Sequence, residues 1–129
     1  MSNEHVVREI TDAIGAHGAW KLRLRTAINT GRSDVTPRAA ACDDQCAFGS
    51  WLYGESIDRS TKAELPYQVI KRLHAEFHQA AGNVLSLAVS GEQTKAVDLL
   101  EGDYTEKSEK LVRALTKWKR ELSQSVAAD

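Results

Sequence analysis

Residues 66–88 read PYQVIKRLHAEFHQAAGNVLSLA, and the spacing of their apolar side chains decides the fold class. One stripe recurs at steps of three and four residues and contains Tyr67, Ile70, His74, Phe77, Ala81, Val84 and Ala88. Such a period is typical of a helix that buries one face. Pro66 suits the first turn, the Thr61–Glu64 spacing fits a capping box, and Ser90-Gly91 is an end signal.

Two further stretches show the same period on either side of this segment. Residues from about 4 to 30 carry a stripe of Val7, Ile10, Ile14, His17, Leu24 and Ile28. Residues from about 92 to 123 carry another, made of Val97, Leu100, Tyr104, Leu111, Leu115, Trp118 and Leu122, with Gly102 as the expected site of a kink. Each stretch predicts a long helix.

The segment between the first two long helices is polar and is broken by Pro37. We expect a single short helix there, over residues 46–53, with Asp43 or Asp44 as its N-cap and Gly54 at its end. No segment alternates long enough to predict a strand. The sequence therefore predicts an all-α four-helix bundle with one short helix and three long helices, as a single domain over residues 1–129.

The charge balance excludes several classes of partner. There are 17 Lys and Arg residues against 18 Asp and Glu, a net charge of −1, so nucleic acid and anionic membrane surfaces are not expected partners. The longest uncharged run, residues 77–91, is too short and too polar to span a bilayer. The polar start, MSNEH, lacks the features of a secretory signal, which predicts a cytoplasmic protein with reduced cysteines.

Three histidines and one cysteine form the candidate site. His74 and His78 are four residues apart, so both imidazoles lie on one helix face and can bind one ion. A lone histidine on an apolar face is usually a hydrogen-bonded core residue, but His17 and Cys46 would complete the pair with a nitrogen and a sulfur. Imidazole and thiolate ligands suit zinc, whereas calcium and magnesium prefer oxygen.

The neighbours of these residues fit a closed metal site. We expect Gly49 to allow a close helix approach, and Trp20, Phe48 and Trp51 to shield the site from water, although ordinary aromatic core packing would explain them too. The start of a helix would favour the Cys46 thiolate.

Enzymatic alternatives fit this pattern less well. In zincin hydrolases the catalytic glutamate directly follows the first histidine, whereas Glu76 is two residues on and rotated by about 200°. Four protein ligands would also leave no open position for water, so we expect no enzyme activity. The Glu-x-x-His pairs of di-iron bundles and the Cys-x-x-Cys-His haem motif are absent from the sequence, while non-covalent haem binding stays open.

Three motifs in the chain resemble those of the chemoreceptor zinc-binding (CZB) domains. They are HGAW at residues 17–20, CAFGSW at 46–51 and HAEFH at 74–78, separated by 25 and 22 residues. The resemblance implies that His17, Cys46, His74 and His78 bind one Zn²⁺ ion in a homodimeric sensory module. Such domains regulate chemoreceptors and diguanylate cyclases, through zinc occupancy or oxidation of the zinc-bound cysteine.

Three questions stay open at the level of sequence. Without an output domain of its own, this chain acts on a signalling partner in trans or is a piece of a longer receptor or cyclase. Cys42 lies four residues before Cys46, so it is a candidate to resolve an oxidised Cys46 or to replace it as a ligand, although a spare thiol is the simpler interpretation. A structural zinc site that serves dimerisation or protein interaction is the alternative function.

Overall fold

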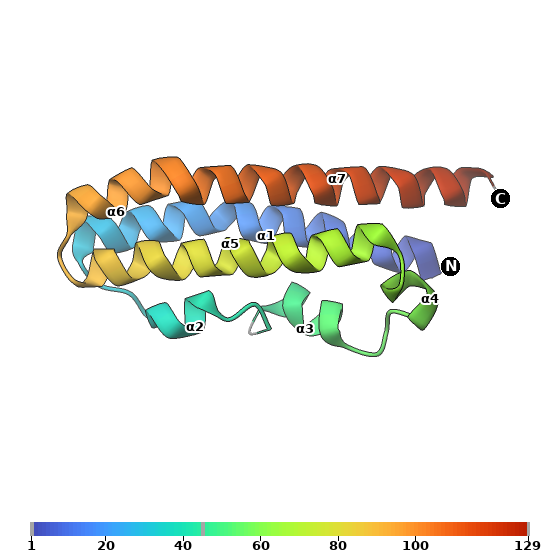
Figure 1. The fold of residues 1–129 in the computed structure, drawn as a ribbon, viewed down its shortest axis with the longest axis horizontal. Helices are drawn as coiled ribbons and strands as arrows, with labels where there is room; N and C mark the ends of the chain where they lie inside the picture. The colour runs from blue at the N-terminus through green and yellow to red at the C-terminus, as the bar shows by residue number, and fades with distance from the viewer. Residues whose placement is uncertain (1, 45, 129) are drawn as a thin grey trace.

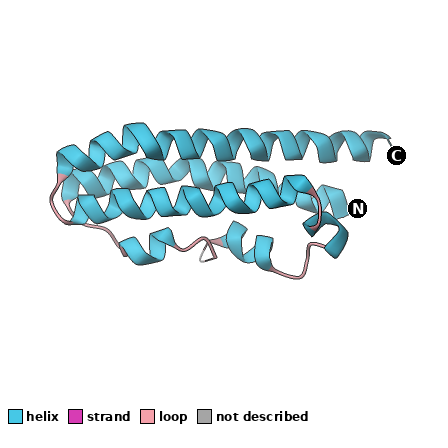
Figure 2. Ribbon diagram, in the orientation of Figure 1, coloured by secondary structure: helices cyan, strands magenta, loops and turns pink. Residues whose placement is uncertain are grey.

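Three long helices run side by side along the length of the molecule (Figure 1). They are α1 (Ser2–Thr30), α5 (Leu65–Val89) and α7 (Thr105–Ala128), and each contacts the other two. The computed structural model describes residues 2–44 and 46–128. Over these residues Figure 2 shows helices and loops without strands, which confirms the predicted all-α bundle.

The last long helix contains an irregular turn. Helix α6 (Gln93–Leu99) passes into a π-helical turn, η1 (Leu100–Tyr104), and then into α7. Gly102, the expected kink position, lies within this turn. A π-helical turn widens the backbone locally, and here it places Leu100 and Tyr104 in the core. The predicted helix over 92–123 is therefore present but not uniform, and it continues to Ala128.

The segment between α1 and α5 contains more helix than expected. Instead of one short helix it forms α2 (Pro37–Ala41), α3 (Ala47–Tyr53) and α4 (Arg59–Lys62), which lie along one side of the bundle (Figure 1). Pro37 begins a helix rather than interrupting the chain, because the Thr36 hydroxyl accepts a hydrogen bond from the Ala39 N–H at 3.1 Å.

Two predicted caps were wrong. The N-cap of α3 is Cys46 itself, not Asp43 or Asp44, and its sulfur accepts a hydrogen bond from the Gly49 N–H at 3.3 Å. The expected capping box at Thr61 and Glu64 is absent because Thr61 belongs to α4, whose N-cap is Asp58. Glu64 precedes α5 without a side-chain capping bond, while a proline in the first turn is as predicted.

The core runs along the axis between the long helices. Its largest fully buried apolar side chains come from α1, α3, α5, η1 and α7, and they include Ile10, Leu24, Leu52, Ile70, Phe77, Leu85, Leu100, Tyr104, Leu111 and Leu115. Among the side chains that the structure describes, three buried polar ones interrupt this core: His17, His74 and His78. Within the described residues no helix combines the length and apolar character needed to cross a membrane.

A glycine allows α2 to pack closely on α5. A Cβ atom at Gly82 would lie 2.7 Å from the Cβ of Ala41 and 2.9 Å from the carbonyl oxygen of Pro37. Neither neighbour is the end of a flexible side chain, so α2 would have to move away from α5. The contact at Gly82 therefore fixes the position of α2 against the bundle.

We expect Gly82→Ala to destabilise the protein by about 1–2 kcal/mol, because the clash with α2 outweighs the gain in helix propensity. The matched control is Gly15→Ala in α1, where an added Cβ meets no atom within 4 Å. This control should be neutral or stabilising by up to about 1 kcal/mol. Urea unfolding followed by circular dichroism measures both, and equal stability of the two variants would contradict the close packing of α2 and α5.

Candidate metal centre

Four side chains from three helices converge at the middle of the bundle. His17 comes from α1, Cys46 from the N-terminus of α3, and His74 and His78 from successive turns of α5. One nitrogen or sulfur atom of each residue lies within 4.8 Å of the corresponding atom of every other. The structure thus brings together all four residues singled out in the sequence.

The distances between the donor atoms fit a tetrahedral metal site. Nε2 of His74 lies 3.1 Å from Nε2 of His17 and 3.4 Å from Sγ of Cys46, and Nε2 of His78 lies 3.5 Å from the same sulfur. Zinc–ligand bonds of usual length would give edges of about 3.3 Å between nitrogens and about 3.6 Å between nitrogen and sulfur. Three of the six distances between donor atoms are therefore already close to those that a four-coordinate zinc ion requires, and all four donor atoms lie within 4.8 Å of one another.

Backbone carbonyls orient two of the imidazoles. Nδ1 of His17 lies 2.7 Å from the carbonyl oxygen of Ala13, and Nδ1 of His78 lies 3.0 Å from that of Ala40. A carbonyl can only accept, so both Nδ1 atoms carry hydrogen and both Nε2 atoms present a lone pair to the cluster. Nδ1 of His74 is buried and has no hydrogen-bond partner among the described residues.

The family model of the chemoreceptor zinc-binding domain matches residues 17–85. This match begins at the first histidine of the cluster and includes the other three members. The chain belongs to the chemoreceptor zinc-binding domain family. It is a zinc-binding domain, as its donor set also indicates. Neither the curated proteins nor the solved structures contain a match to the chain.

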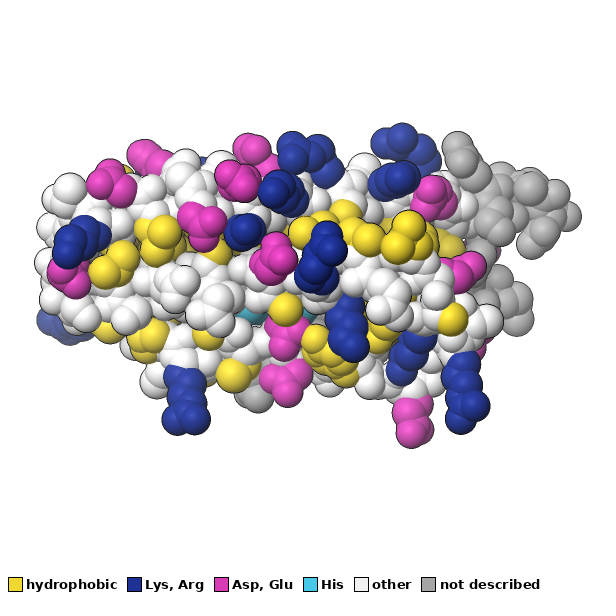
Figure 3. All heavy atoms as spheres, in the orientation of Figure 1, with side chains coloured by type: hydrophobic (Ala, Val, Ile, Leu, Met, Phe, Trp, Pro, Cys, Tyr) yellow, Lys and Arg dark blue, Asp and Glu magenta, His cyan; other side chains and the backbone are white. Residues whose placement is uncertain are grey.

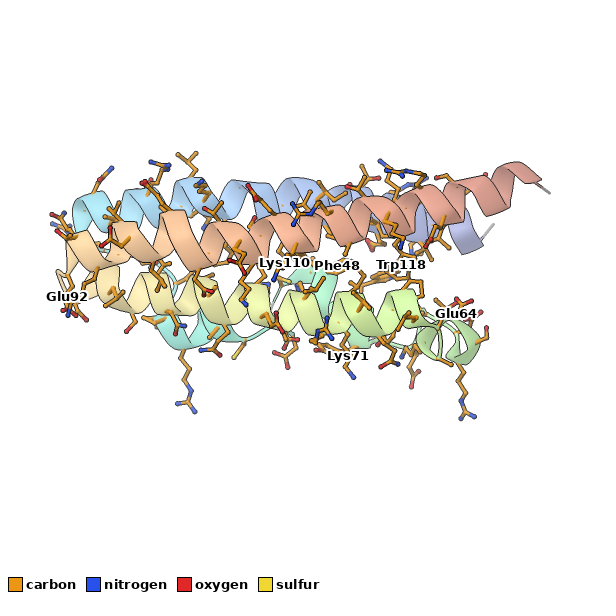
Figure 4. The ribbon with its side chains drawn as sticks, turned by 45° about the horizontal axis from the view of Figure 1, so that its top comes forward. Phe48, Glu64, Lys71, Glu92, Lys110 and Trp118 are labelled. Carbon is orange, nitrogen blue, oxygen red and sulfur yellow. The ribbon has the colours of Figure 1, made fainter. Side chains whose placement is uncertain are left out.

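Aromatic rings surround the histidines of this zinc-binding domain. Phe48 packs edge-on against His17 and His74, with ring centroids 5.9 and 5.2 Å apart, and Trp20 packs against His78 at 6.1 Å. Figure 4 shows Phe48 near the middle of the bundle's length. Trp51 is one layer further out, against Phe48 at 5.6 Å. Apolar rings in these positions lower the local polarity and strengthen interactions between ligands and a metal ion.

Phe77 is a neighbour of the site that the sequence analysis placed only in the core. Its ring lies 4.9 Å from that of His17 and 5.3 Å from that of His78. Its position between His74 and His78 on the same helical stripe was a usable signal. The hydrogen bond from His17 to the carbonyl of Ala13 could also have been predicted, because the two residues are four apart in one helix. The hydrogen bond from His78 to the carbonyl of Ala40 could not, because Ala40 belongs to the unexpected helix α2.

Gly49 permits a close approach, but not of another helix. A Cβ atom there would overlap the carbonyl oxygen of Asp43 and lie 3.1 Å from the Cα of Asp44, so the neighbour is the loop that precedes α3. The same loop is tied to α3 by a hydrogen bond from the Tyr53 hydroxyl to the Asp43 carboxylate. Close packing of the loop on α3 holds Cys46 against the histidines. Cys42 is a half-buried free thiol at the end of α2 and lies outside the four-residue cluster.

Burial keeps the imidazoles neutral. Desolvation lowers the pKa of His17 to about 4, against a weaker opposing effect of its hydrogen bond to Ala13. Desolvation also lowers the pKa of His74 and that of His78, and in His74 the two other imidazoles add to the effect. Neutral imidazole is the form that binds metal, so the site needs no histidine deprotonation at pH 7.

The thiol of Cys46 behaves differently. Burial raises its pKa, and this outweighs the hydrogen bond from the Gly49 N–H at the start of α3, which lowers it. The negative charge of Asp43 adds to the increase. The helix N-terminus, expected to favour the thiolate, is therefore not the dominant influence in the protein without metal. Binding of a zinc ion would release the Cys46 proton, because only the thiolate is a ligand.

We expect the zinc-free protein to lose stability as the pH falls from about 7 towards 4. The unfolded histidines have a pKa near 6.5, whereas that of folded His17 is about 4, so the unfolded state binds more protons across this range. The contribution of each buried imidazole is complete above pH ~6.5 and decreases by up to about 1.4 kcal/mol per pH unit below it.

Urea unfolding of the chelator-treated protein at several pH values measures this dependence. The control is His5→Gln, which removes an exposed histidine and should leave the slope unchanged. An unfolding free energy that is flat between pH 7 and 5 would contradict the burial of neutral imidazoles.

Proposed function

We propose that this protein is a regulatory zinc sensor in which His17, Cys46, His74 and His78 hold one Zn²⁺ ion and Cys46 acts as the switch. One observation carries the proposal: the three histidines are only 0–2% exposed, whereas Cys46 is the half-buried member of the set. The least shielded ligand is also the one that an oxidant can convert chemically.

The arrangement favours regulation over catalysis. Four protein ligands complete a tetrahedral zinc ion and leave no position for a reacting water. Glu76, the carboxylate nearest in sequence to the histidine pair, lies 3.9 Å from Arg72 and 3.8 Å from Lys107. Its position among surface cations is unsuited to a general base at the metal. Zinc bound here would link α1, α3 and α5 through ligands from all three helices.

Oxidation of Cys46 would weaken the site directly. With hydrogen peroxide, the thiolate sulfur loses two electrons, gains one oxygen atom to become a sulfenate, and the second oxygen leaves as water. Hypochlorous acid removes the same two electrons from the sulfur and also yields the sulfenate, while its chlorine leaves as chloride. The sulfur is then a poorer ligand than thiolate, so three imidazoles are left to hold the ion. Because Cys46 also caps α3, its release would free the start of that helix.

The proposed output of the switch rests on the resemblance to the family. We propose that the domain acts in the cytoplasm as a homodimer and controls a chemoreceptor or a diguanylate cyclase, in the same chain or as a separate partner. A groove between α5 and α7 supports a contact with a second copy, because its apolar lining of Leu65, Val69, Ala114 and Trp118 is bordered by Lys117 and Glu121. Figure 3 shows hydrophobic side chains gathered between these two helices. Leu65 is 75% exposed in the single chain.

A structural zinc site is the second candidate function. It is favoured by the closed ligand set, since structural zinc usually has four protein ligands. In that case the metal would hold the bundle together for dimerisation, and its removal would unfold the chain. The two functions therefore differ in the state of the zinc-free protein.

Addition of a slight excess of hypochlorous acid should release zinc from the protein while the helix content is retained. Zinc release is measured with a chromogenic chelator, the metal stoichiometry by native mass spectrometry, and the helix content by circular dichroism. Cys42→Ser is the control: it should hold one zinc per chain and release it as the wild type does. Cys46→Ser should lose zinc affinity by about tenfold or more, because a thiolate ligand is removed.

Two outcomes would contradict the proposal that the protein is a zinc sensor. If zinc stays bound until oxidant unfolds the protein, Cys46 is not a switch. If a chelator alone abolishes the circular dichroism signal of the helices, the metal is structural. A preparation that binds no zinc would overturn both functions.

A further inference from the structure

A surface pocket leads to the proposed metal centre between α1 and α3. Its volume is about 160 Å³, and its outer part is formed by Glu9, Asp12 and Ala16 of α1. Its inner part is formed by His17, Cys46 and Phe48. Asp12 and Ala16 are exposed while His17 and Phe48 are buried, so the pocket extends from solvent to two members of the cluster.

The other two ligands are covered by protein. His74 is 0% exposed and His78 is 1% exposed. The ring of Phe77 packs against His78, and the carbonyl of Ala40 accepts its Nδ1–H bond. The pocket therefore reaches the cluster on the side of the sulfur, which is the atom that reacts with oxidants and thiol reagents.

The charged groups of the pocket are of one sign. Glu9 and Asp12, one turn apart on α1, are the two ionisable side chains at its mouth, and both are acidic. Trp20 also lines this pocket, and the Arg23 guanidinium lies 4.3 Å from the centroid of its ring, but Arg23 itself lines a different pocket. A passage bordered by two carboxylates favours cations and neutral molecules over anions.

We propose that this pocket is the entrance through which small reactants and metal ions reach Cys46, and that Glu9 and Asp12 select against anions. The metal part of this proposal rests on the proposed zinc function. The part that concerns access to the Cys46 sulfur is independent of the zinc function, because the pocket is present in the protein without metal. Neutral oxidants and hydrated zinc ions would both be admitted, as a zinc and redox sensor requires.

The first test blocks the pocket with a side chain. In a helix, long side chains point towards the N-terminus, so a phenylalanine at position 16 would lie over the mouth near Asp12 and Ala13. In a Cys42→Ser background Cys46 is the single cysteine of the chain. Alkylation of the zinc-free protein by iodoacetamide, which forms a carbon–sulfur bond and expels iodide, then reports access to this sulfur.

Ala16→Phe should slow this alkylation by about threefold or more, because reaction at a cysteine requires access as well as thiolate. The matched control is Ala19→Phe, an exposed position on the same helix that does not line the pocket. Circular dichroism confirms that both variants are folded. Alkylation of Ala16→Phe at the wild-type rate, or equal slowing by Ala19→Phe, would overturn the proposal.

The second test uses charge and leaves the shape intact. The variant Glu9→Gln with Asp12→Asn should raise the rate of the anionic reagent iodoacetate relative to neutral iodoacetamide by about threefold, since two nearby negative charges are removed. The ratio of the two rates cancels any change in the thiolate fraction of Cys46. Asp98→Asn with Glu101→Gln changes the net charge equally at exposed positions far along the chain and should leave the ratio unchanged. If the ratio of the iodoacetate rate to the iodoacetamide rate is unchanged in Glu9→Gln with Asp12→Asn, the two carboxylates do not select against anions.

Measuring zinc binding by the same variants shows whether the entrance or the zinc function has failed. Every variant of these two tests keeps the four ligands, so each should bind one zinc per chain at equilibrium. Ala16→Phe should slow zinc transfer to a chelator by about threefold or more through restricted access. If no variant binds zinc but the alkylation results hold, the zinc function fails and the entrance stands. If all bind zinc and alkylation is unaffected, the entrance fails alone.

Discussion

The convergence of three neutral imidazoles and one thiol inside an apolar bundle is the constraint on which the rest of the structure depends. Each buried polar group without a partner costs about 1–3 kcal/mol, and Nδ1 of His74 already has none among the described residues. A zinc ion would satisfy the Nε2 atoms of all three histidines and the sulfur of Cys46 at once. The metal would thereby link α1, α3 and α5, and its loss would remove a contact from each of the three helices.

The long helices were predictable because their stabilising interactions are local in sequence. Apolar side chains recur every three to four residues in α1, α5 and α7, and most of the buried residues of the structure follow this spacing. Val97, which the stripe of residues 92–123 included, is an exception, because it is 38% exposed. The segment between α1 and α5 was less predictable. Its short helices have little periodicity, and α2 exists because Thr36 and Pro37 start a helix that then packs on Gly82.

The grouping of His17, Cys46, His74 and His78 could be predicted from residue type and spacing, and the structure brings the four together. What spacing does not encode is how the rings are oriented. The Ala40 carbonyl that orients His78 and the loop that Gly49 admits belong to segments without a regular period. The pKa of Cys46 likewise depends on burial outweighing a helix N-terminus, a balance that only three-dimensional packing determines.

X-ray absorption at the zinc edge identifies the ligand atoms of the bound ion and so decides whether His17, Cys46, His74 and His78 form one closed site. A closed site of three histidines and Cys46 predicts a four-coordinate zinc ion with three nitrogens at about 2.0–2.1 Å and one sulfur at about 2.3 Å. In Cys46→Ser the sulfur contribution should disappear, while Cys42→Ser should leave it intact. A wild-type spectrum without sulfur, or with a five- or six-coordinate oxygen-rich shell, would contradict the assignment of Cys46 and the histidines as one closed zinc site.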